Sequence, residues 1–223
     1  MKIKMKIIII NASPRKNGAT AKILSEFADN LSAKGDTEIK YINLSDYKLD
    51  FCAGCCACYK TGACHIDDDA ELISALIDGA DGVIIGTPTY ASNVSGQLKV
   101  LIDRGHFVIE QLLKNKHTVG IVTYENAEGG AALKVLKKLC VFSGARTFGK
   151  LAVKLPFNTE PLVSGKIKRK SDKIYKAVAG NKSASLTNSI IHFFVFNFGI
   201  KPFVLRKGDR YGGVRAHWER RGI

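Results

Sequence analysis

The sequence predicts an α/β protein built on one doubly wound sheet of five parallel strands. Short apolar runs rich in β-branched residues alternate with stretches whose apolar residues recur at helical spacing, about five times between residues 5 and 155. The connections are mostly short, and no internal repeat or low-complexity linker interrupts the alternation. Such alternation implies parallel strands joined by right-handed crossovers, with helices on both faces.

The first half of the predicted sheet begins with four isoleucines at residues 7–10, the pattern of a strand buried on both faces. Turn residues follow at 13–18, and an apolar helical face starts after Ala19. Residues 37–44 alternate apolar and polar side chains and are predicted to form the second strand. A long loop at residues 45–66 comes next and holds most of the cysteines.

The second half continues the alternation to residue 155. Three aspartates favour a helix start because carboxylates are stabilised at the positive end of a helix. The predicted elements are a helix after the aspartates at 67–69, a strand at 82–87, a helix from about Val94, a strand at 116–123, a helix at 129–140 and a strand at 148–155. We therefore expect residues 1–155 to form one domain and residues 156–223 to be a C-terminal extension.

Charge is concentrated in the extension. Of the formal net charge of +14, residues 150–223 contribute +12, from 16 Lys and Arg against 4 Asp and Glu. The first ten residues are too short for an export signal, and no apolar run reaches membrane-spanning length. Five of the six cysteines fall between Cys52 and Cys64, which without an export signal favours metal binding or redox work over disulfides. We expect a cytoplasmic protein without a membrane span.

The loop after the first strand has the chemistry of a phosphate site. It opens a helix, whose free backbone N–H groups and positive dipole end attract anions. Ser13, Asn17 and Thr20 add donors beside Arg15. Neither G-x-x-x-x-G-K-[ST] nor G-x-G-x-x-G occurs, which argues against an NTPase and a Rossmann dinucleotide site. An ordinary capped strand-to-helix turn is the alternative.

Two segments resemble the flavodoxin-like NAD(P)H-dependent FMN reductases and iron-sulfur flavoproteins. They are S-P-R-x-N-G-x-T at residues 13–20 and G-[ST]-P-x-Y-x-x-x-x-[ST]-G-x-L-K at 86–99, continued by Asp103-Arg104. The resemblance implies a strand order of 2-1-3-4-5 and FMN between strands one and three, where the strand order reverses. The residues expected to bind FMN are Ser13, Arg15, Asn17, Gly18, Ala19, Thr20, Pro88, Thr89, Tyr90 and Asn93.

The second segment needs no charged side chain to hold a flavin. Pro88 fixes the chain so that backbone N–H groups can face the flavin edge, and Tyr90 can shield the ring from water. Taken alone, Tyr90 and Asn93 also suit a packed aromatic side chain and a helix cap. A third loop at residues 123–130 is expected to close over the ring, but its glycines also suit a simple turn. No side chain is predicted to be catalytic, because the cofactor carries the chemistry.

The cysteines follow the pattern Cys52-x-x-Cys55-x-x-Cys58-x5-Cys64, with Cys56 in addition. Thiolates at such spacing can bind one soft metal centre. The resemblance implies that the four cysteines of the pattern bind a [4Fe–4S] cluster. Free or redox-active thiols and a four-cysteine zinc site are the two alternatives.

Other residues have simpler interpretations. Cys140 lies on an apolar helical face and is expected in the core. The five histidines share no ligand-like spacing and are interpreted as structural or surface residues.

The extension combines a basic helix at residues 165–176 with a phenylalanine-rich segment at 186–205. His192, Asn197, Lys201 and Pro202 interrupt the apolar run. We expect the phenylalanines to form subunit contacts in a dimer or tetramer. An acidic redox protein such as ferredoxin, the phosphates of NADPH and an anionic membrane surface are other candidate partners for the positive charge. Nucleic acid is not expected, because no recognised binding module accompanies the charge.

Together these features predict an FMN-dependent oxidoreductase. Electrons would come from NAD(P)H, or from a ferredoxin-type donor through the cysteine cluster, and pass to a small acceptor such as a quinone, a free flavin or an oxygen species. A non-enzymatic flavodoxin-type carrier is one alternative, although such carriers are typically acidic and this chain is basic. An interaction module with a four-cysteine zinc site is the other.

Overall fold

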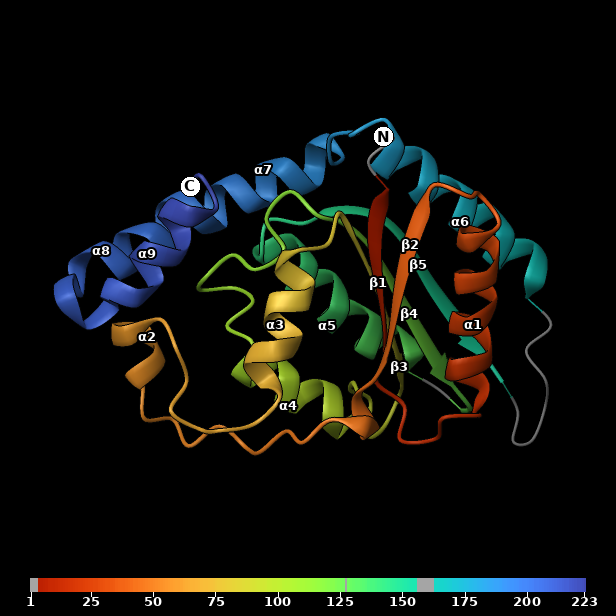
Figure 1. Ribbon diagram of the computed structural model, residues 1–223, viewed down its shortest axis with the longest axis horizontal. Helices are drawn as coiled ribbons and strands as arrows, with labels where there is room; N and C mark the ends of the chain where they lie inside the picture. The colour runs from red at the N-terminus through yellow and green to blue at the C-terminus, as the bar shows by residue number, and fades with distance from the viewer. Residues whose placement is uncertain (1–3, 127, 156–162) are drawn as a thin grey trace.

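A parallel sheet of five strands in the order β2-β1-β3-β4-β5 forms the centre of the molecule (Figure 1). The computed structural model describes residues 4–126, 128–155 and 163–223. The predicted doubly wound α/β fold is confirmed, with the strand order that the resemblance implies. The strands are β1 (Met5–Asn11), β2 (Thr37–Asn43), β3 (Gly82–Pro88), β4 (His117–Tyr124) and β5 (Arg146–Lys154).

The isoleucine run of β1 serves both faces of the sheet. Ile7 and Ile9 belong to the core beneath one helical layer, and Ile8 and Ile10 to the core beneath the other. This division follows from the strand, because successive side chains point to opposite faces. The first layer contains α1 (Ala19–Ser32) and α6 (Ser164–Ala179), and the second contains α3 (Ala70–Asp78), α4 (Gly96–Arg104) and α5 (Gly129–Phe142), as Figure 1 shows.

Helix α6 is part of the central core, although composition alone assigns it to the basic extension. Ile167, Ile174 and Val178 are buried against β1, β3, β4 and β5. Its lysines lie on the opposite, exposed side of the helix. Positive charge and core packing are thus carried by two faces of one amphipathic helix.

Two local predictions differ from the structure, one at the start of the helix after β3 and one in the cysteine loop. Helix α4 begins at Gly96 rather than Val94, because Ser95 is its N-cap and accepts a hydrogen bond from the Leu98 amide. The long cysteine loop also contains a five-residue helix, α2 (Ala57–Thr61), after the 3-10 turn η1 (Leu44–Asp46).

The aspartates at 67–69 do more than start a helix. Helix α3 begins at Ala70, as their position suggests, but Asp69 makes no side-chain cap to it. Instead the Asp69 carboxylate accepts a hydrogen bond from the Lys48 amide, and Asp68 accepts one from the Asp50 amide. These aspartates therefore tie down the start of the cysteine loop.

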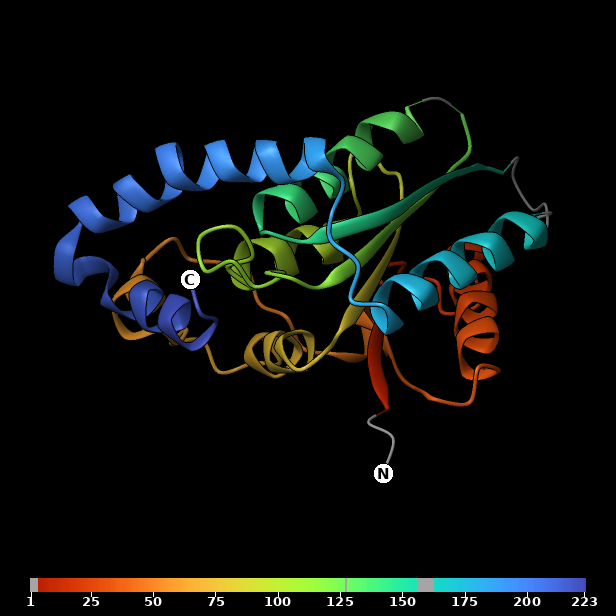
Figure 2. The ribbon, with the colours of Figure 1, turned by 90° about the horizontal axis from the view of Figure 1, so that it is seen from above.

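The C-terminal segment runs as one long helix away from the sheet and then folds back (Figures 1 and 2). Helix α7 (Leu186–Phe194), the π-helical segment η2 (Val195–Ile200) and α8 (Lys201–Arg206) are continuous, and η3 (Gly208–Tyr211) leads into α9 (Gly212–Arg220). Polar residues and Pro202 interrupt the apolar run of the sequence, but the helix continues through them. Pro202 lies in the first turn of α8, directly after the π segment, where a missing backbone donor is tolerated.

This long helix is also more apolar than the sequence argument allowed. Leu186–Arg206 spans 21 residues with a mean hydropathy of 1.3, enough by length and composition to cross a membrane, and 17% of the window is buried. Buried core helices of soluble proteins and signal sequences pass the same test, and one such helix is weak evidence. The absence of a membrane span therefore stays a prediction.

Candidate functional site

The loop between β1 and α1 is closed by its own side chains. The Ser13 amide donates to Asn11 Oδ1, and the Ser13 hydroxyl accepts from the Arg15 amide at 3.1 Å. Ser13 is 4% exposed, whereas Arg15 and Asn17 are exposed. These bonds fold the loop back over the carboxyl end of β1, at the point where the strand order reverses.

Helix α1 offers uncapped backbone donors at this loop. Its N-cap is Gly18, which has no side chain to accept a hydrogen bond from the first turn. The first turn contains no acidic residue either. Backbone N–H groups with neither a capping oxygen nor a nearby carboxylate are the donors that phosphate binds at helix N-termini.

Direct hydrogen bonds join three loops at the carboxyl edge of the sheet. The Ser95 hydroxyl donates to Ala12 O at 2.6 Å, which fixes the loop after β3 to the loop after β1. The hydroxyls of Thr20 and Thr123 lie 2.7 Å apart, and the Thr89 amide donates to Thr123 O at 2.8 Å. Ser95, Thr20 and Thr123 are all buried. The loops after β1, β3 and β4 therefore form one braced surface.

Replacing Ser95 with alanine is expected to loosen this surface. The change leaves Ala12 O without its hydroxyl donor and removes the α4 cap, so we expect unfolding free energy to fall by about 1–3 kcal/mol. Urea denaturation measures this loss. Ser25→Ala, on the exposed face of α1, is the control and should stay within about 0.5 kcal/mol of the parent protein. Equal stability of the two variants would contradict the bracing role of Ser95.

The loop after β3 presents Tyr90 to solvent on a tight turn. Tyr90 and Asn93 exchange two backbone hydrogen bonds of 3.0 Å, and Ala91 and Ser92 between them have φ of 46° and 62°. Left-handed backbone at two non-glycine residues is strained, and such strain concentrates at functional sites. Tyr90 is 42% exposed, as expected for an aromatic side chain that covers a ligand.

One buried polar atom at this loop is free for a ligand. The Thr89 hydroxyl has no hydrogen-bond partner among the described residues. Asn93 is less available, because its side-chain oxygen already accepts from the Val94 amide. The uncapped start of α1, the free Thr89 hydroxyl and the exposed Tyr90 ring fit a ligand with an anionic end and a flat polar ring, such as FMN.

The sequence-predicted FMN residues lie on two of the three braced loops. The structure places Ser13, Arg15, Asn17 and Gly18 between β1 and α1, Ala19 and Thr20 in the first turn of α1, Pro88 at the end of β3, and Thr89, Tyr90 and Asn93 after β3. Strands β1 and β3 are hydrogen-bonded neighbours, so the two loops meet at one edge. The role of each residue toward FMN stays a prediction.

In the loop after β4, the structure explains why residue 129 is a glycine, which the sequence alone could not show. A Cβ on Gly129 would lie 2.2 Å from the Tyr124 ring, whereas a Cβ on Gly130 would meet nothing within 4 Å. Gly129 therefore lets helix α5 begin against Tyr124 at the end of β4.

The cysteine loop holds its thiols at the surface without assembling a ligand set. Cys52, Cys55 and Cys56 are exposed, and Cys58 and Cys64 are half-buried. Cys55 Sγ lies 3.3 Å from His65 Nδ1, and the Cys52 sulfur accepts from the Gly54 amide. Within the described ranges, no three Cys, His, Asp or Glu side chains are arranged to hold a metal ion. The donor chemistry suits a soft metal centre, and the four-cysteine ligand set stays a prediction.

Arg104 binds both ends of the cysteine loop, at Asp50 and at Asp68. Its guanidinium makes two bonds to the Asp68 carboxylate, of 2.7 and 2.9 Å, and one to Asp50 O at 2.7 Å. The Arg104 and Asp68 side chains are 1% and 0% exposed. Burial lowers the pKa of Arg104, but Asp68 and the Cys64 thiol outweigh burial and raise it. Arg104, the last residue of the family-like segment, thus holds the loop in place through Asp68 and Asp50.

Asp68 is expected to make stability depend on acid pH. Burial raises the pKa of Asp68, but hydrogen bonds from Arg104 and from the amides of Asp50 and Ala70 outweigh it, so the net pKa is lowered. A lowered folded-state pKa stabilises the fold above the unfolded value, about 3.9, and this contribution is lost as pH falls through the folded-state pKa. The free-energy gap between the parent protein and Asp68→Asn should therefore shrink below about pH 4. A gap independent of pH in urea denaturation would contradict the assignment.

Two histidines that the sequence analysis treated as unremarkable flank a buried carboxylate next to the loop. Glu110 is 5% exposed, and His106 Nδ1 lies 2.8 Å from Oε1, while His217 Nε2 lies 3.3 Å from Oε2. Burial lowers the pKa of His106, but Cys58 and Glu110 outweigh it and raise the pKa to about 10. The spacing of His106 and Glu110, four residues apart, was the available signal. His217, more than 100 residues away, had none.

Comparison with known proteins supports this interpretation of the fold. The chain is 38% identical over 224 residues to an iron-sulfur flavoprotein of Clostridioides difficile strain 630, covering 98% of this chain and all of the relative. It is 34% identical to an iron-sulfur flavoprotein of Archaeoglobus fulgidus, over 70% of this chain and 77% of the relative.

Solved structures show the same fold at lower identity. The crystal structure of an NADH:FMN oxidoreductase has a TM-score of 0.59 at 22% identity, covering 78% of this chain and 90% of that one. Oxidised flavodoxin 1 from Bacillus cereus has a TM-score of 0.56 at 17% identity, covering 77% and 97%. The family model described as NADPH-dependent FMN reductase matches residues 5–160, which include all three braced loops. The chain therefore belongs to the NADPH-dependent FMN reductase family, and its fold is flavodoxin-like.

Proposed function

We propose that this protein is an FMN-dependent oxidoreductase that takes electrons from NAD(P)H and passes them to a small acceptor such as a quinone, a free flavin or an oxygen species. The observation that carries the proposal is the braced surface at the carboxyl edge of the sheet, where Thr123 bonds both to Thr20 in the uncapped first turn of α1 and to the Thr89 amide, next to the exposed Tyr90. Bound FMN would supply the chemistry, because its ring accepts a hydride or single electrons.

The chain's own residues would bind and orient the cofactor. The first turn of α1 and the Ser13 loop would hold the phosphate, and the bonds from Ser95 and Thr123 would keep the two ring-binding loops at a fixed separation. Tyr90 would exclude water from one face of the ring. None of these roles needs an acid or base, which agrees with the absence of a predicted catalytic side chain.

We further propose that the cysteine loop binds a [4Fe–4S] cluster through Cys52, Cys55, Cys58 and Cys64. Support comes from the four thiols within one surface loop and from relatives named iron-sulfur flavoproteins, one matched along its whole length. A cluster would allow a ferredoxin-type donor to deliver single electrons. Free thiols and a zinc site are the competing assignments for the same residues.

One preparation tests the cofactor proposals together. The protein is purified without oxygen from iron-supplied cells, its absorption spectrum is recorded, and flavin, iron and sulfide are counted. We expect flavin bands with about four iron and four sulfide per chain. Flavin without iron would contradict the cluster proposal and leave the reductase proposal standing. Zinc without flavin would favour the interaction module instead.

The same sample tests for enzyme activity. Rapid oxidation of NADPH or NADH, in the presence of a quinone or free FMN, supports a reductase and excludes a pure electron carrier. If flavin is bound but neither nucleotide reduces it, reduced ferredoxin is added as the donor. If only ferredoxin reduces the flavin, ferredoxin rather than NAD(P)H would be the electron donor in the proposal.

We also propose that the protein is a homo-oligomer, through the exposed apolar side of the long C-terminal helix. Phe193, Phe194 and Phe198 stand on it, with exposed fractions of 55%, 57% and 70%, and their rings contact one another. The variant Phe194→Glu/Phe198→Glu should run as a monomer in light scattering after size exclusion, where the parent protein runs as a dimer or tetramer. A monomeric parent protein would contradict this proposal.

A further inference from the structure

The C-terminal helices pack directly against helix α2 of the cysteine loop. Figures 1 and 2 show α9 lying beside α2, far from it in the sequence. The rings of Tyr59 in α2 and Tyr211 are stacked, with centroids 4.8 Å apart and an interplanar angle of 22°. Trp218 Nε1 donates to Ile109 O at 2.8 Å and thereby fixes α9 to the body of the protein.

The loop has little packing of its own to keep its thiols in place. Helix α2 is five residues long and contains no buried residue. An isolated helix of that length is not stable in water, so its position depends on tertiary contacts. The apolar contacts come from a small third core of α8, α9 and the π segment, against which Tyr59 packs. The buried residues of this core are Phe196, Ile200, Val204, Val214 and Trp218.

The closest approach of the two segments is backbone on backbone. A Cβ on Gly213 would lie 2.0 Å from the Gly62 nitrogen and 2.6 Å from its Cα, so any side chain there would push the loop away. Next to this contact, His217 Nε2 lies 2.8 Å from Gly62 O. Because a carbonyl only accepts, Nε2 carries the proton and donates to the loop.

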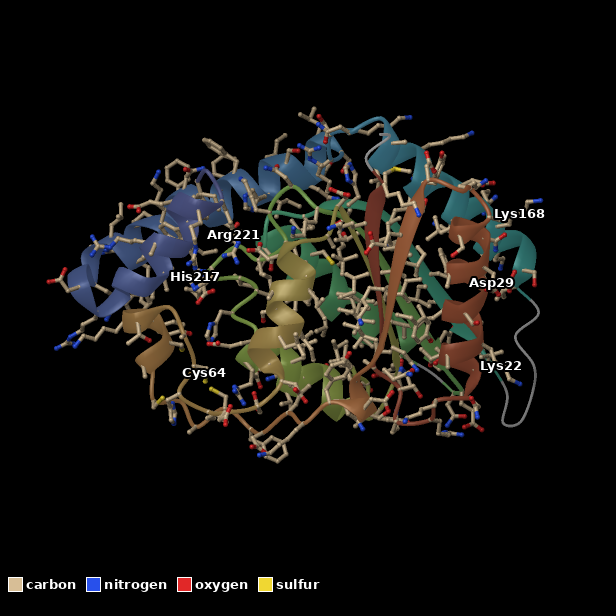
Figure 3. All side chains as sticks on the ribbon, viewed as in Figure 1. Lys22, Asp29, Cys64, Lys168, His217 and Arg221 are labelled. Carbon is tan, nitrogen blue, oxygen red and sulfur yellow. The ribbon has the colours of Figure 1, made fainter. Side chains whose placement is uncertain are left out.

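A buried polar network extends this support to the thiols. Glu110 is paired with His217 on one side and with His106 on the other, and His106 in turn lies beside the Cys58 thiol. Arg221 Nη1 donates to Glu110 O at 2.7 Å. The two histidines, Glu110 and Arg221 border a cavity of about 260 Å³ that also has Cys64 and Arg104 in its wall. Figure 3 shows Cys64, His217 and Arg221 on this side of the molecule.

We propose that α9 is the scaffold of the thiol site, with Gly213 and His217 as positioning residues that hold residues 56–64 of the cysteine loop. The C-terminal extension thereby gains a role that its basic composition did not suggest. The proposal rests on the proposed function only in assuming that the thiols are used. The contacts themselves hold for a cluster, a zinc site or free thiols.

Gly213→Ala tests the close approach, with Gly212→Ala as the matched control. A Cβ on Gly212 would meet only Lys60 O, at an ordinary 3.6 Å. Metal-free protein is labelled with N-ethylmaleimide, and the labelling rate of each cysteine is read by mass spectrometry. We expect about tenfold faster labelling of Cys58 and Cys64 in Gly213→Ala, because overpacking shifts the loop toward open states. Exposed Cys52 and buried Cys140 should keep their rates and serve as internal references.

His217 provides a second test that does not depend on the glycine variant folding well. His217→Ala should speed labelling of the same two cysteines, and His217→Gln, whose side-chain amide can donate to Gly62 O, should restore slow labelling. The proposal is overturned if Gly213→Ala labels at the rate of Gly212→Ala, or if His217→Ala labels at the parent rate.

The proposed function is tested by two measurements other than cysteine labelling, FMN affinity and iron content. FMN affinity should be unchanged in all four variants, since α9 packs against α2 at the opposite end of the molecule from α1 (Figure 1). After anaerobic addition of iron and sulfide, lower iron content in Gly213→Ala alone would extend the scaffold role to cluster binding. If the parent protein binds FMN but no cluster, the cluster proposal fails while the labelling result still decides the scaffold.

Discussion

Replacing Arg104 with leucine is expected to lower the free energy of unfolding by about 3–5 kcal/mol, because it leaves the fully buried Asp68 carboxylate without its charge partner. The same change removes the donor to Asp50 O, at the other end of the cysteine loop. We therefore expect a large drop in the urea midpoint and faster labelling of the loop cysteines. FMN binding under native conditions should persist, since Arg104 lies outside the braced loops.

The control for this prediction removes both charges. In Arg104→Leu/Asp68→Leu no buried carboxylate is left unpaired, and replacing a buried ion pair by apolar side chains is often close to neutral. We expect the double variant to recover most of the stability that the single variant loses. A single variant as stable as the parent protein would show that the pair does not anchor the loop.

Replacing Gly18 with aspartate is expected to separate cofactor binding from stability. The new carboxylate would stand at the N-cap of α1, accept hydrogen bonds from the free amides and repel the FMN phosphate. We expect FMN affinity to fall about 100-fold, equal to about 2.7 kcal/mol, because charge-assisted hydrogen bonds to the phosphate are lost. Stability of the cofactor-free protein should change by less than about 0.5 kcal/mol, since aspartate caps helices slightly better than glycine.

The variant Gly18→Asn separates the effect of charge on FMN binding from the effect of side-chain size at the same position. Asparagine caps as well as aspartate and has nearly the same size, but it carries no charge. A Cβ at residue 18 would lie 3.1 Å from the Arg15 Cβ in either variant, so both share the same steric cost. We expect Asn to weaken FMN binding much less than Asp, measured by flavin fluorescence. Equal losses in the two variants would mean that crowding, rather than the phosphate charge, explains the result.

The fold could be predicted because its signals are local. Four isoleucines in a row indicate a strand buried on both faces, and the structure divides them two and two between the helical layers. Family-like spacing around Pro88 and Gly18 located two loops, and parallel pairing of β1 and β3 brings them together. Strand and helix ends shifted by one or two residues where a cap such as Ser95 set the boundary.

The support of the cysteine loop could not be predicted, because it is made by residues far apart in the sequence. His217 and Gly62 are 155 positions apart, and Arg104 and Asp68 are 36 apart. A histidine or arginine in such a pair has no local pattern that distinguishes it from a surface residue. The sequence also did not indicate the π segment in the long C-terminal helix, which continues through Asn197 and Pro202 to Arg206.

The most direct test of the central claim compares FMN with riboflavin, which lacks only the phosphate. Cofactor-free protein is titrated with each flavin, and flavin fluorescence gives the two dissociation constants. If the first turn of α1 holds the phosphate, FMN should bind at least about 100-fold more tightly than riboflavin. Equal affinities, or no binding of either flavin, would contradict the assignment of this loop as a phosphate site.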